Sequence, residues 1–246
     1  DDEWDHVWHR PFKNFSGDIS GRFLEVMALT PAHNRPTQLV DQLVREVLRS
    51  QRPDGSFSAS GPIDWNQPID GDADIYTARM MPVLWGNSRM LCGLVEAARA
   101  FGGDPLMHCA RNLGSFYQRI LPRFTAPGHV AEYTDSGTYA AGYPTCYFPA
   151  MEGLVKLYQL CGDKQHLATA IKMAAFYSGF DNIPIDHSHG MLCGQVGLLL
   201  LHEATGNPEY LHRVEARWKE LVDGGYINPA GGILEKCRPV FFRDEG

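Results

Sequence analysis

Two histidines have the spacing and the neighbours of a reactive or metal-binding site. His187 and His189 stand in the segment Asp186-His187-Ser188-His189-Gly190. A His-x-His pair beside an aspartate can bind a metal ion or supply a general base, and it can equally be a pair of hydrogen-bonded loop residues. Because the segment precedes an apolar helical stretch, we expect both imidazoles to lie at a functional site.

Two late glutamates, Glu235 and Glu245, are candidates for acid–base chemistry. Most glycoside hydrolases use a pair of carboxyl groups, one as the acid and the other as nucleophile or base. The chain contains no GxSxG, GxGxxG, P-loop or HExxH motif. Their absence disfavours an esterase, a dinucleotide-dependent enzyme, an NTPase and a zinc protease of the HExxH class.

Aromatic and amide side chains stand close to the expected starts of two apolar helices. Trp85 and Asn87 lie in Trp85-Gly86-Asn87-Ser88, and Tyr147 lies just before Pro149, which suits a first helical turn. We expect Trp85, Asn87 and Tyr147 to face the opening of a binding site. A tryptophan there can stack on a sugar ring, although tryptophan is also a common core residue.

An internal repeat predicts the elements that position these residues. Three segments share one plan, in which an apolar helix is followed by a tight glycine turn and a second, amphipathic helix. Their turns lie at Gly102-Gly103-Asp104, Gly162-Asp163 and Gly206-Asn207. Each glycine suits a left-handed helix end, and the following Asp or Asn can cap the next helix. A fourth pair is expected upstream, from Ile19 to Leu29 and from Leu39 to Leu48 with Thr37 as N-cap.

The connections within the pairs are short, whereas those between pairs are long. The long ones run over residues 52–87, 122–149 and 179–190, and another stretch follows residue 223. Long connections are uncommon in compact domains unless they are functional or disordered, and these are rich in Trp, Tyr, His and Asp. Since paired helices alternate in direction, we expect every long connection at one end, which we call the working end.

The pattern predicts an all-α fold of the (α/α)6 toroid type. The first helices are apolar nearly all round and carry Gly93, Gly153, Gly194 and Gly197, as closely packed inner helices would. The second helices have polar faces and should form an outer layer. A helical solenoid is the alternative, but the turns are unequally spaced. Four pairs are too few for six, so residues 1–246 are expected to form one incomplete toroid domain from a longer chain.

The composition of the chain disfavours several classes of binding partner and bears on the compartment. The formal charge of −7 and the pI near 5.8 argue against nucleic acid and anionic membranes, which favour basic surfaces. No apolar run approaches the roughly 20 residues that cross a bilayer. The six cysteines form no CxxC pair and stand largely in apolar stretches, as buried thiols of a reducing compartment do, which favours the cytoplasm over export.

The repeat and several short sequence motifs resemble those of glycoside hydrolase family 127, the β-L-arabinofuranosidases built on an (α/α)6 toroid. The similarity runs along nearly the whole chain. The QxxDG and TGN motifs are shared by several toroid glycosidases. It rests on Gly17-Asp18-Ile19 with Phe23-Leu24-Glu25, Gln51-Arg52-Pro53-Asp54-Gly55-Ser56-Phe57, Leu154-Val155-Lys156-Leu157-Tyr158, His187-Ser188-His189, Thr205-Gly206-Asn207 and Gly231-Gly232.

The resemblance implies a glycosidase that acts on a carbohydrate with a zinc-bound thiolate. Glu235 would be the general acid, Glu245 a zinc ligand, and His187 a residue of the sugar site. Asn87 and Tyr147 stand where the family has histidines, and Cys237 matches none of its metal-binding cysteines. A non-catalytic carbohydrate-binding or interaction toroid, an unsaturated uronyl hydrolase and a polysaccharide lyase remain as alternatives.

Overall fold

The protein is all-α, as predicted. The structure, a computed structural model, describes residues 15–59, 61–66, 80–125, 146–181, 188–228 and 230–233. Within these ranges the only β pairing is an isolated bridge between Ile227 and Ile233. The α-helices are α2 (Asp18–Leu29), α3 (Thr37–Ser50), α4 (Met80–Phe101), α5 (Asp104–Phe124), α8 (Ala150–Cys161), α9 (Lys164–Tyr177), α10 (Ser188–Thr205) and α11 (Pro208–Asp223), with 3₁₀ turns η2 (Ala32–Asn34) and η3 (Ser178–Phe180).

The predicted glycine turns are confirmed. Gly102, Gly162 and Gly206 all have a φ of 71°, the left-handed region in which a side chain would be strained. The amide of Gly162 donates to the carbonyl of Tyr158, and that of Gly206 to His202, each at 2.8 Å. These bonds close the last turn of α8 and α10, so that α9 and α11 can start at once in the opposite direction.

Two of the predicted N-caps are confirmed, and two are wrong. The carboxylate of Asp163 accepts from the amide of Gln165 at 2.9 Å, and the Asn207 side chain caps α11 in the same way. Asp104 is instead the first residue of α5, which follows Gly103 without a side-chain cap. Thr37 is likewise already helical, because α3 starts directly after Pro36.

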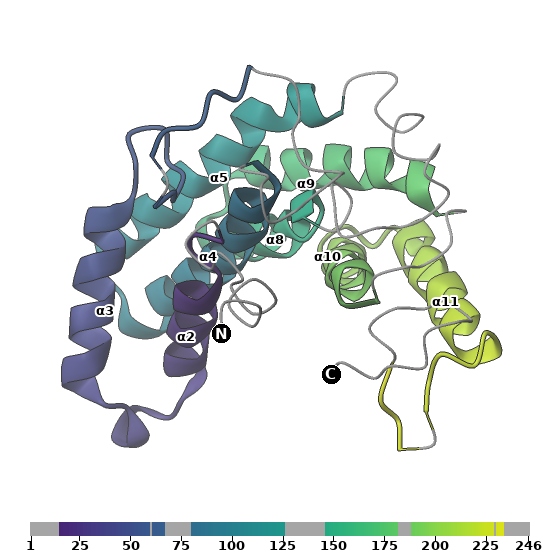
Figure 1. The fold of residues 1–246 in the computed structure, drawn as a ribbon, viewed down its shortest axis with the longest axis horizontal. Coiled ribbons are helices and arrows are strands. Elements are labelled where there is room, and N and C mark those ends of the chain that lie inside the picture. The colour runs from purple at the N-terminus through teal and green to yellow at the C-terminus, as the bar shows by residue number, and fades with distance from the viewer. Residues whose placement is uncertain are drawn as a thin grey trace, which may run out of the picture.

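The helices form two curved layers (Figure 1). In the inner layer α4 packs between α2 and α8, and α8 in turn contacts α10. In the outer layer α5 contacts both α3 and α9, while α11 packs on α10. The predicted inner and outer helices are therefore confirmed. The described helices form an arc with two edges, one at α2 and α3 and the other at α10 and α11.

Glycine residues allow the helices of the inner layer to pack closely. A Cβ on Gly93 of α4 would lie 2.2 Å from the backbone oxygen of Gly21 in α2, and one on Gly21 would lie 2.5 Å from the backbone of Met90. The two helices therefore touch backbone to backbone. Every residue of α4 from Met80 to Ala98 is buried, as predicted for an inner helix.

None of the described helices is both long and apolar enough to span a membrane.

The expectation that α10 is buried on all sides is wrong. Val196 and Leu199 of this helix are exposed. The physical reason is its place at one edge of the arc, where α8 and α11 cover only part of its surface. The glycines of α10 still make close contacts, since a Cβ on Gly194 would meet the Tyr177 ring and one on Gly197 would meet Met151.

The cysteines behave as buried thiols, as predicted. The five described cysteines are free, and all except Cys161 are fully buried. Burial raises the pKa of Cys109 to about 12, so its thiol stays protonated at neutral pH. Cys237 lies outside the described residues.

A buried histidine makes the α5–α9 contact sensitive to pH. His166 of α9 is packed against Gly114 of α5, where an added Cβ would lie 2.8 Å from the ring. Its Nδ1 is buried without a hydrogen-bond partner within the described structure. Burial lowers the pKa of His166 and outweighs the opposing effect of Asp163, while Arg111 lowers it further. The imidazole is therefore held neutral.

We expect acidification to weaken the fold through His166. Because its pKa is lower in the folded chain than in the unfolded one, where it is about 6.5, this stability is complete above that pH and declines as pH falls towards the folded-state value. Urea unfolding at pH 7.5 and 5.5 measures the decline. The His166→Gln variant should lose less stability over this interval than the parent. His108→Gln, on the exposed face of α5, should lose as much as the parent; equal declines in all three would contradict the assignment.

Candidate functional site

Two predicted site residues lie inside a helix rather than before one. Helix α4 starts at Met80, so Trp85 and Asn87 belong to its second turn. The segment looked like a loop because it contains Pro82, Gly86 and Asn87. Pro82 is tolerated within the first turn of a helix, where its missing amide hydrogen bond costs nothing. Gly86 lies where a Cβ would be 2.4 Å from the backbone oxygen of Ser16.

Asn87 is a structural residue, which corrects its prediction as a substrate-binding one. Its side chain is completely buried. Its oxygen accepts from the amide of Phe57 at 2.8 Å, and its nitrogen donates to the carbonyls of Phe57 and Val83 at 2.8 and 2.7 Å. The amide thereby joins the segment after α3 to the start of α4. Its hydrogen-bonding groups are used within the protein and face no ligand.

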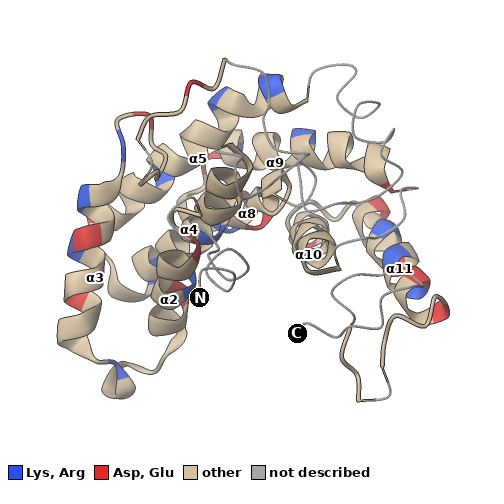
Figure 2. Cartoon of the chain, in the orientation of Figure 1, with Lys and Arg blue, Asp and Glu red and all other residues tan. Residues whose placement is uncertain are grey.

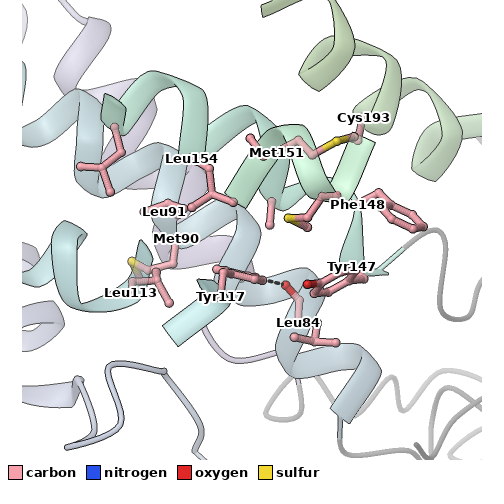
Figure 3. Close-up of a cluster of buried hydrophobic side chains, with 14 of the residues drawn as sticks. Leu84, Met90, Leu91, Leu113, Tyr117, Tyr147, Phe148, Met151, Leu154 and Cys193 are labelled. Atoms are coloured by element: carbon pink, nitrogen blue, oxygen red, sulfur yellow. Dashed lines mark hydrogen bonds between the residues drawn. The ribbon is translucent and has the colours of Figure 1, made fainter. Parts of the chain in front are cut away.

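Tyr147 is also a core residue, and its prediction as a sugar contact is corrected in the same way. Its ring is fully buried and stacks on Phe124 with the centroids 4.7 Å apart. Figure 3 shows it beside Tyr117, whose hydroxyl donates to the carbonyl of Leu84 at 2.7 Å. Burial raises the pKa of Tyr147 well above its ordinary value. The aromatic run before α8 therefore fills the core instead of lining an opening.

His189 is the predicted site residue that reaches the surface. It lies in the first turn of α10 and is exposed. Its ring meets the edge of Trp85 with the centroids 5.2 Å apart, so the structure brings these two predicted residues together from different hairpins. His187, Glu235 and Glu245 lie outside the described residues, and their predictions stay predictions.

Trp85 positions charged groups instead of offering a face to a sugar. Only 7% of its surface is exposed. The guanidinium of Arg22 lies 5.7 Å from its ring centre and that of Arg89 lies 5.8 Å away. Cation–π contact and the edge contact with His189 hold all three side chains around the indole. The expected stacking platform is therefore an internal support.

These side chains form one group, which we call the inner-face cluster: Arg22, Trp85, Arg89, His189 and Cys193. Arg22 of α2 is 39% exposed, and its Nε donates to the Asp18 carboxylate at 2.7 Å. Its terminal nitrogens make no further hydrogen bond within the described ranges. These nitrogens are available to an oxygen-rich ligand beside the exposed ring of His189. The cluster lies in the early turns of α2, α4 and α10, at the working end.

Beneath the inner-face cluster runs a network of buried charges. Arg89 donates to the carboxylate of Glu152 at 3.0 Å, and Lys156 donates to the same group at 2.8 Å. Lys156 also pairs with Glu25 at 3.1 Å and lies 3.7 Å from Glu96. Figure 2 shows charged residues of α2, α4 and α8 where these helices meet. The network thus links three inner helices below the candidate site.

The network keeps its members charged. Burial alone would raise the pKa of Glu152, but Arg89 and Lys156 outweigh it and hold that pKa below its ordinary value. Burial opposes the charge of Arg89 as well, yet the ion pair with Glu152 helps to keep its pKa above the ordinary value. A desolvated charge is tolerated only with close partners of opposite sign. Arg89 is therefore a permanent cation whose position depends on Glu152.

A zinc site does not arise from the described residues. No group of three His, Cys, Asp or Glu side chains within them is arranged to hold a metal ion. Burial raises the pKa of Cys193, although Arg89 works in the opposite direction, so this thiol is not poised to be a thiolate ligand. The predicted ligand Glu245 lies outside the described part of the chain, and zinc stays a prediction from the family resemblance.

A hollow lies at the opposite end of the helices, between α3, the end of α4 and the start of α5. Its volume is about 490 Å³, and its lining includes Arg35, Asp41, Arg45 and Phe101. The Arg35 guanidinium donates to the carbonyls of Ala28 and Thr30 and packs 5.0 Å from the centre of the Phe101 ring. These contacts close the end of α2, so Arg35 has a structural role there. The inner-face cluster remains the better candidate site.

Neither a protein-family model nor a curated protein matches this chain. The resemblance to glycoside hydrolase family 127 therefore rests on the short sequence motifs and on the repeat. The structure adds an arrangement of helix hairpins that is compatible with a toroid, together with the inner-face cluster at the working end.

Proposed function

We propose that the protein is a glycoside hydrolase of the β-L-arabinofuranosidase-like class, with its carbohydrate site over the inner-face cluster. The observation that carries the proposal is the meeting of Arg22 and His189 around Trp85 within the first two turns of three inner helices. A partly exposed guanidinium carries the donors that sugar hydroxyls require, and the exposed ring of His189 lies at the same indole. The buried indole contacts both groups, and the Arg89 side chain, which is paired with Glu152, lies against the same indole.

Chain connectivity supports the placement of the acid. Helix α11 runs antiparallel to α10, so its last residue, Asp223, lies at the same end as His189. Glu235 follows α11 in the sequence, and His187 immediately precedes α10. In the proposed reaction Glu235 donates a proton to the oxygen of the leaving group as the glycosidic bond breaks. Arg22 and His189 hold the sugar by its hydroxyls.

We expect Glu235→Gln to lower kcat by about 10²- to 10⁴-fold, because the amide cannot donate the proton. The intact protein should be assayed on alkyl and nitrophenyl β-L-arabinofuranosides. The loss should be larger for the alkyl glycoside, whose poor leaving group needs protonation more. Glu215→Gln, an exposed change on α11, is the matched control and should act like the parent. Equal rates for Glu235→Gln and the parent would remove Glu235 from the reaction.

One observation favours a second candidate, a carbohydrate-binding toroid without catalysis. Asn87 and Tyr147, which stand where the family that the chain resembles has histidines, are buried in the core. Such a protein could keep the sugar contacts of the inner-face cluster and lack the rest of the reactive site. Measuring binding and turnover of the same arabinoside separates the two candidates. Binding without turnover by the intact protein selects the second.

A further inference from the structure

The hollow beside α3, which we call the α3 hollow, lies between two neighbouring hairpins. One side is formed by α3 and the turn before it, and the other by the end of α4 and the start of α5. All of its lining residues belong to the described ranges. Its volume of about 490 Å³ lies within the range of pockets that bind small organic molecules. Packed helices usually leave no space of this size between them, so the hollow is a candidate binding site.

Part of the wall of the α3 hollow is apolar. Val40 and Val44 are four residues apart in α3 and therefore lie on one side of that helix. Phe101, the last residue of α4, and Leu106, in the first turn of α5, line the hollow from the neighbouring hairpin. Val44 and Phe101 are only half-buried, so part of their surface is open to a ligand. These side chains favour a ligand with a hydrocarbon body.

Two arginines at the α3 hollow carry donors that the protein does not use. Arg35 is held by Nε and Nη2, which donate to the carbonyls of Thr30 and Ala28, while its Nη1 makes no hydrogen bond within the described structure. Arg45 is exposed, and its guanidinium makes neither a hydrogen bond nor an ion pair with any described residue. A guanidinium with free N–H groups binds a carboxylate or a phosphate well. The arginines therefore favour an anionic group on the ligand.

Asp41 restricts the charge of that ligand. It also lines the hollow and stands four residues before Arg45, so the two side chains lie on the same side of α3. Its carboxylate repels negative charge bound near Arg45, and the repulsion grows with the charge of the ligand. A carboxylate with one negative charge is therefore favoured over a phosphate monoester with two.

We propose that the α3 hollow binds a small organic monocarboxylate with an apolar body. Arg35 and Arg45 bind the carboxylate, and the hydrocarbon part lies on Val44 and Phe101. The side of α3 from Thr37 to Arg45 is about 12 Å long, because a helix rises by about 1.5 Å per residue. One aromatic ring with a short chain fits this length. The inference is independent of the proposed carbohydrate chemistry, since the inner-face cluster lies at the other end of the helices.

Ligand-detected NMR titration with 3-phenylpropionate at pH 7.5 tests the proposal. The parent protein should bind this monocarboxylate. It should bind the neutral 3-phenylpropanamide and the dianionic 2-phenylethyl phosphate at least about tenfold more weakly, because the first lacks the charge and the second is repelled by Asp41. A parent that does not bind 3-phenylpropionate, or binds the amide equally well, overturns the proposal. Tighter binding of the phosphate would overturn it in favour of a phosphate site.

Arg45→Gln tests the position of the site. It should weaken the binding of 3-phenylpropionate at least about tenfold, and its exposed side chain can be replaced without disturbing the core. Arg49→Gln is the matched control, because it removes the same charge from an exposed position of α3 outside the lining of the hollow. It should bind like the parent. Asp41→Asn should reduce the preference for the carboxylate over the phosphate. Equal losses in Arg45→Gln and Arg49→Gln, or an unchanged preference in Asp41→Asn, would contradict the assignment.

Discussion

Replacing Gly93 with alanine is expected to lower the free energy of unfolding by about 3 kcal/mol. The added methyl group would lie 2.2 Å from the backbone oxygen of Gly21, at the closest approach of α2 and α4. A backbone atom in a helix cannot turn aside as a side chain can, so the two helices must separate. Alanine's better helix propensity, worth about 1 kcal/mol, only partly offsets this cost. Urea unfolding of the purified variant measures the difference.

Gly153→Ala is the informative comparison for Gly93→Ala. A Cβ on Gly153 of α8 would lie 2.7 Å from the Leu91 side chain, which can change its rotamer. We expect a smaller loss here, about 1 kcal/mol. The order of the two losses reports whether α2 and α4 touch through their backbones. Two equal losses, or a harmless Gly93→Ala, would mean that the α2–α4 contact is looser than the structure has it.

Removing the carboxylate of Glu152 is expected to cost about 3–5 kcal/mol of folding free energy. Arg89 is buried and donates to Glu152 at 3.0 Å, so Glu152→Ala leaves a guanidinium in the core without its main partner. Lys156 loses its 2.8 Å contact as well, although it keeps Glu25. Thermal and urea unfolding of Glu152→Ala at neutral pH measure the effect.

A double variant tests the physical reason for that loss. In Arg89→Met with Glu152→Leu both charges are gone and apolar side chains of similar size fill the space. Because burial of a lone charge is the source of the cost, the double variant should be more stable than Glu152→Ala. Arg49→Met with Glu46→Leu removes an exposed ion pair of α3 and should change stability by less than about 1 kcal/mol. A double variant less stable than Glu152→Ala would contradict the explanation.

The hairpin architecture could be predicted because its signals are local. Gly102, Gly162 and Gly206 mark left-handed helix ends, a conformation that glycine adopts without strain. Asp163 and Asn207 follow directly and accept the hydrogen bonds that begin the next helix. Short turns within pairs and long connections between them then determine which helix ends share a side of the molecule.

The site could be predicted only in part, because burial depends on distant segments. No local pattern indicates that Asn87 binds the backbone of Phe57 or that Tyr147 stacks on Phe124. The Arg89–Glu152 pair was missed for the same reason. Each residue is a lone charge in an apolar helical stretch, and that was the available signal that a buried partner must exist.

Titration calorimetry with methyl β-L-arabinofuranoside tests most directly whether the inner-face cluster is a carbohydrate site. The parent protein should bind, and His189→Ala should bind at least about tenfold more weakly, a loss of about 1.4 kcal/mol. His212→Ala, an exposed change on the outer helix α11, should bind like the parent. Equal affinity of the His189→Ala and His212→Ala proteins, or a parent that binds no arabinoside, would contradict a carbohydrate site at this cluster.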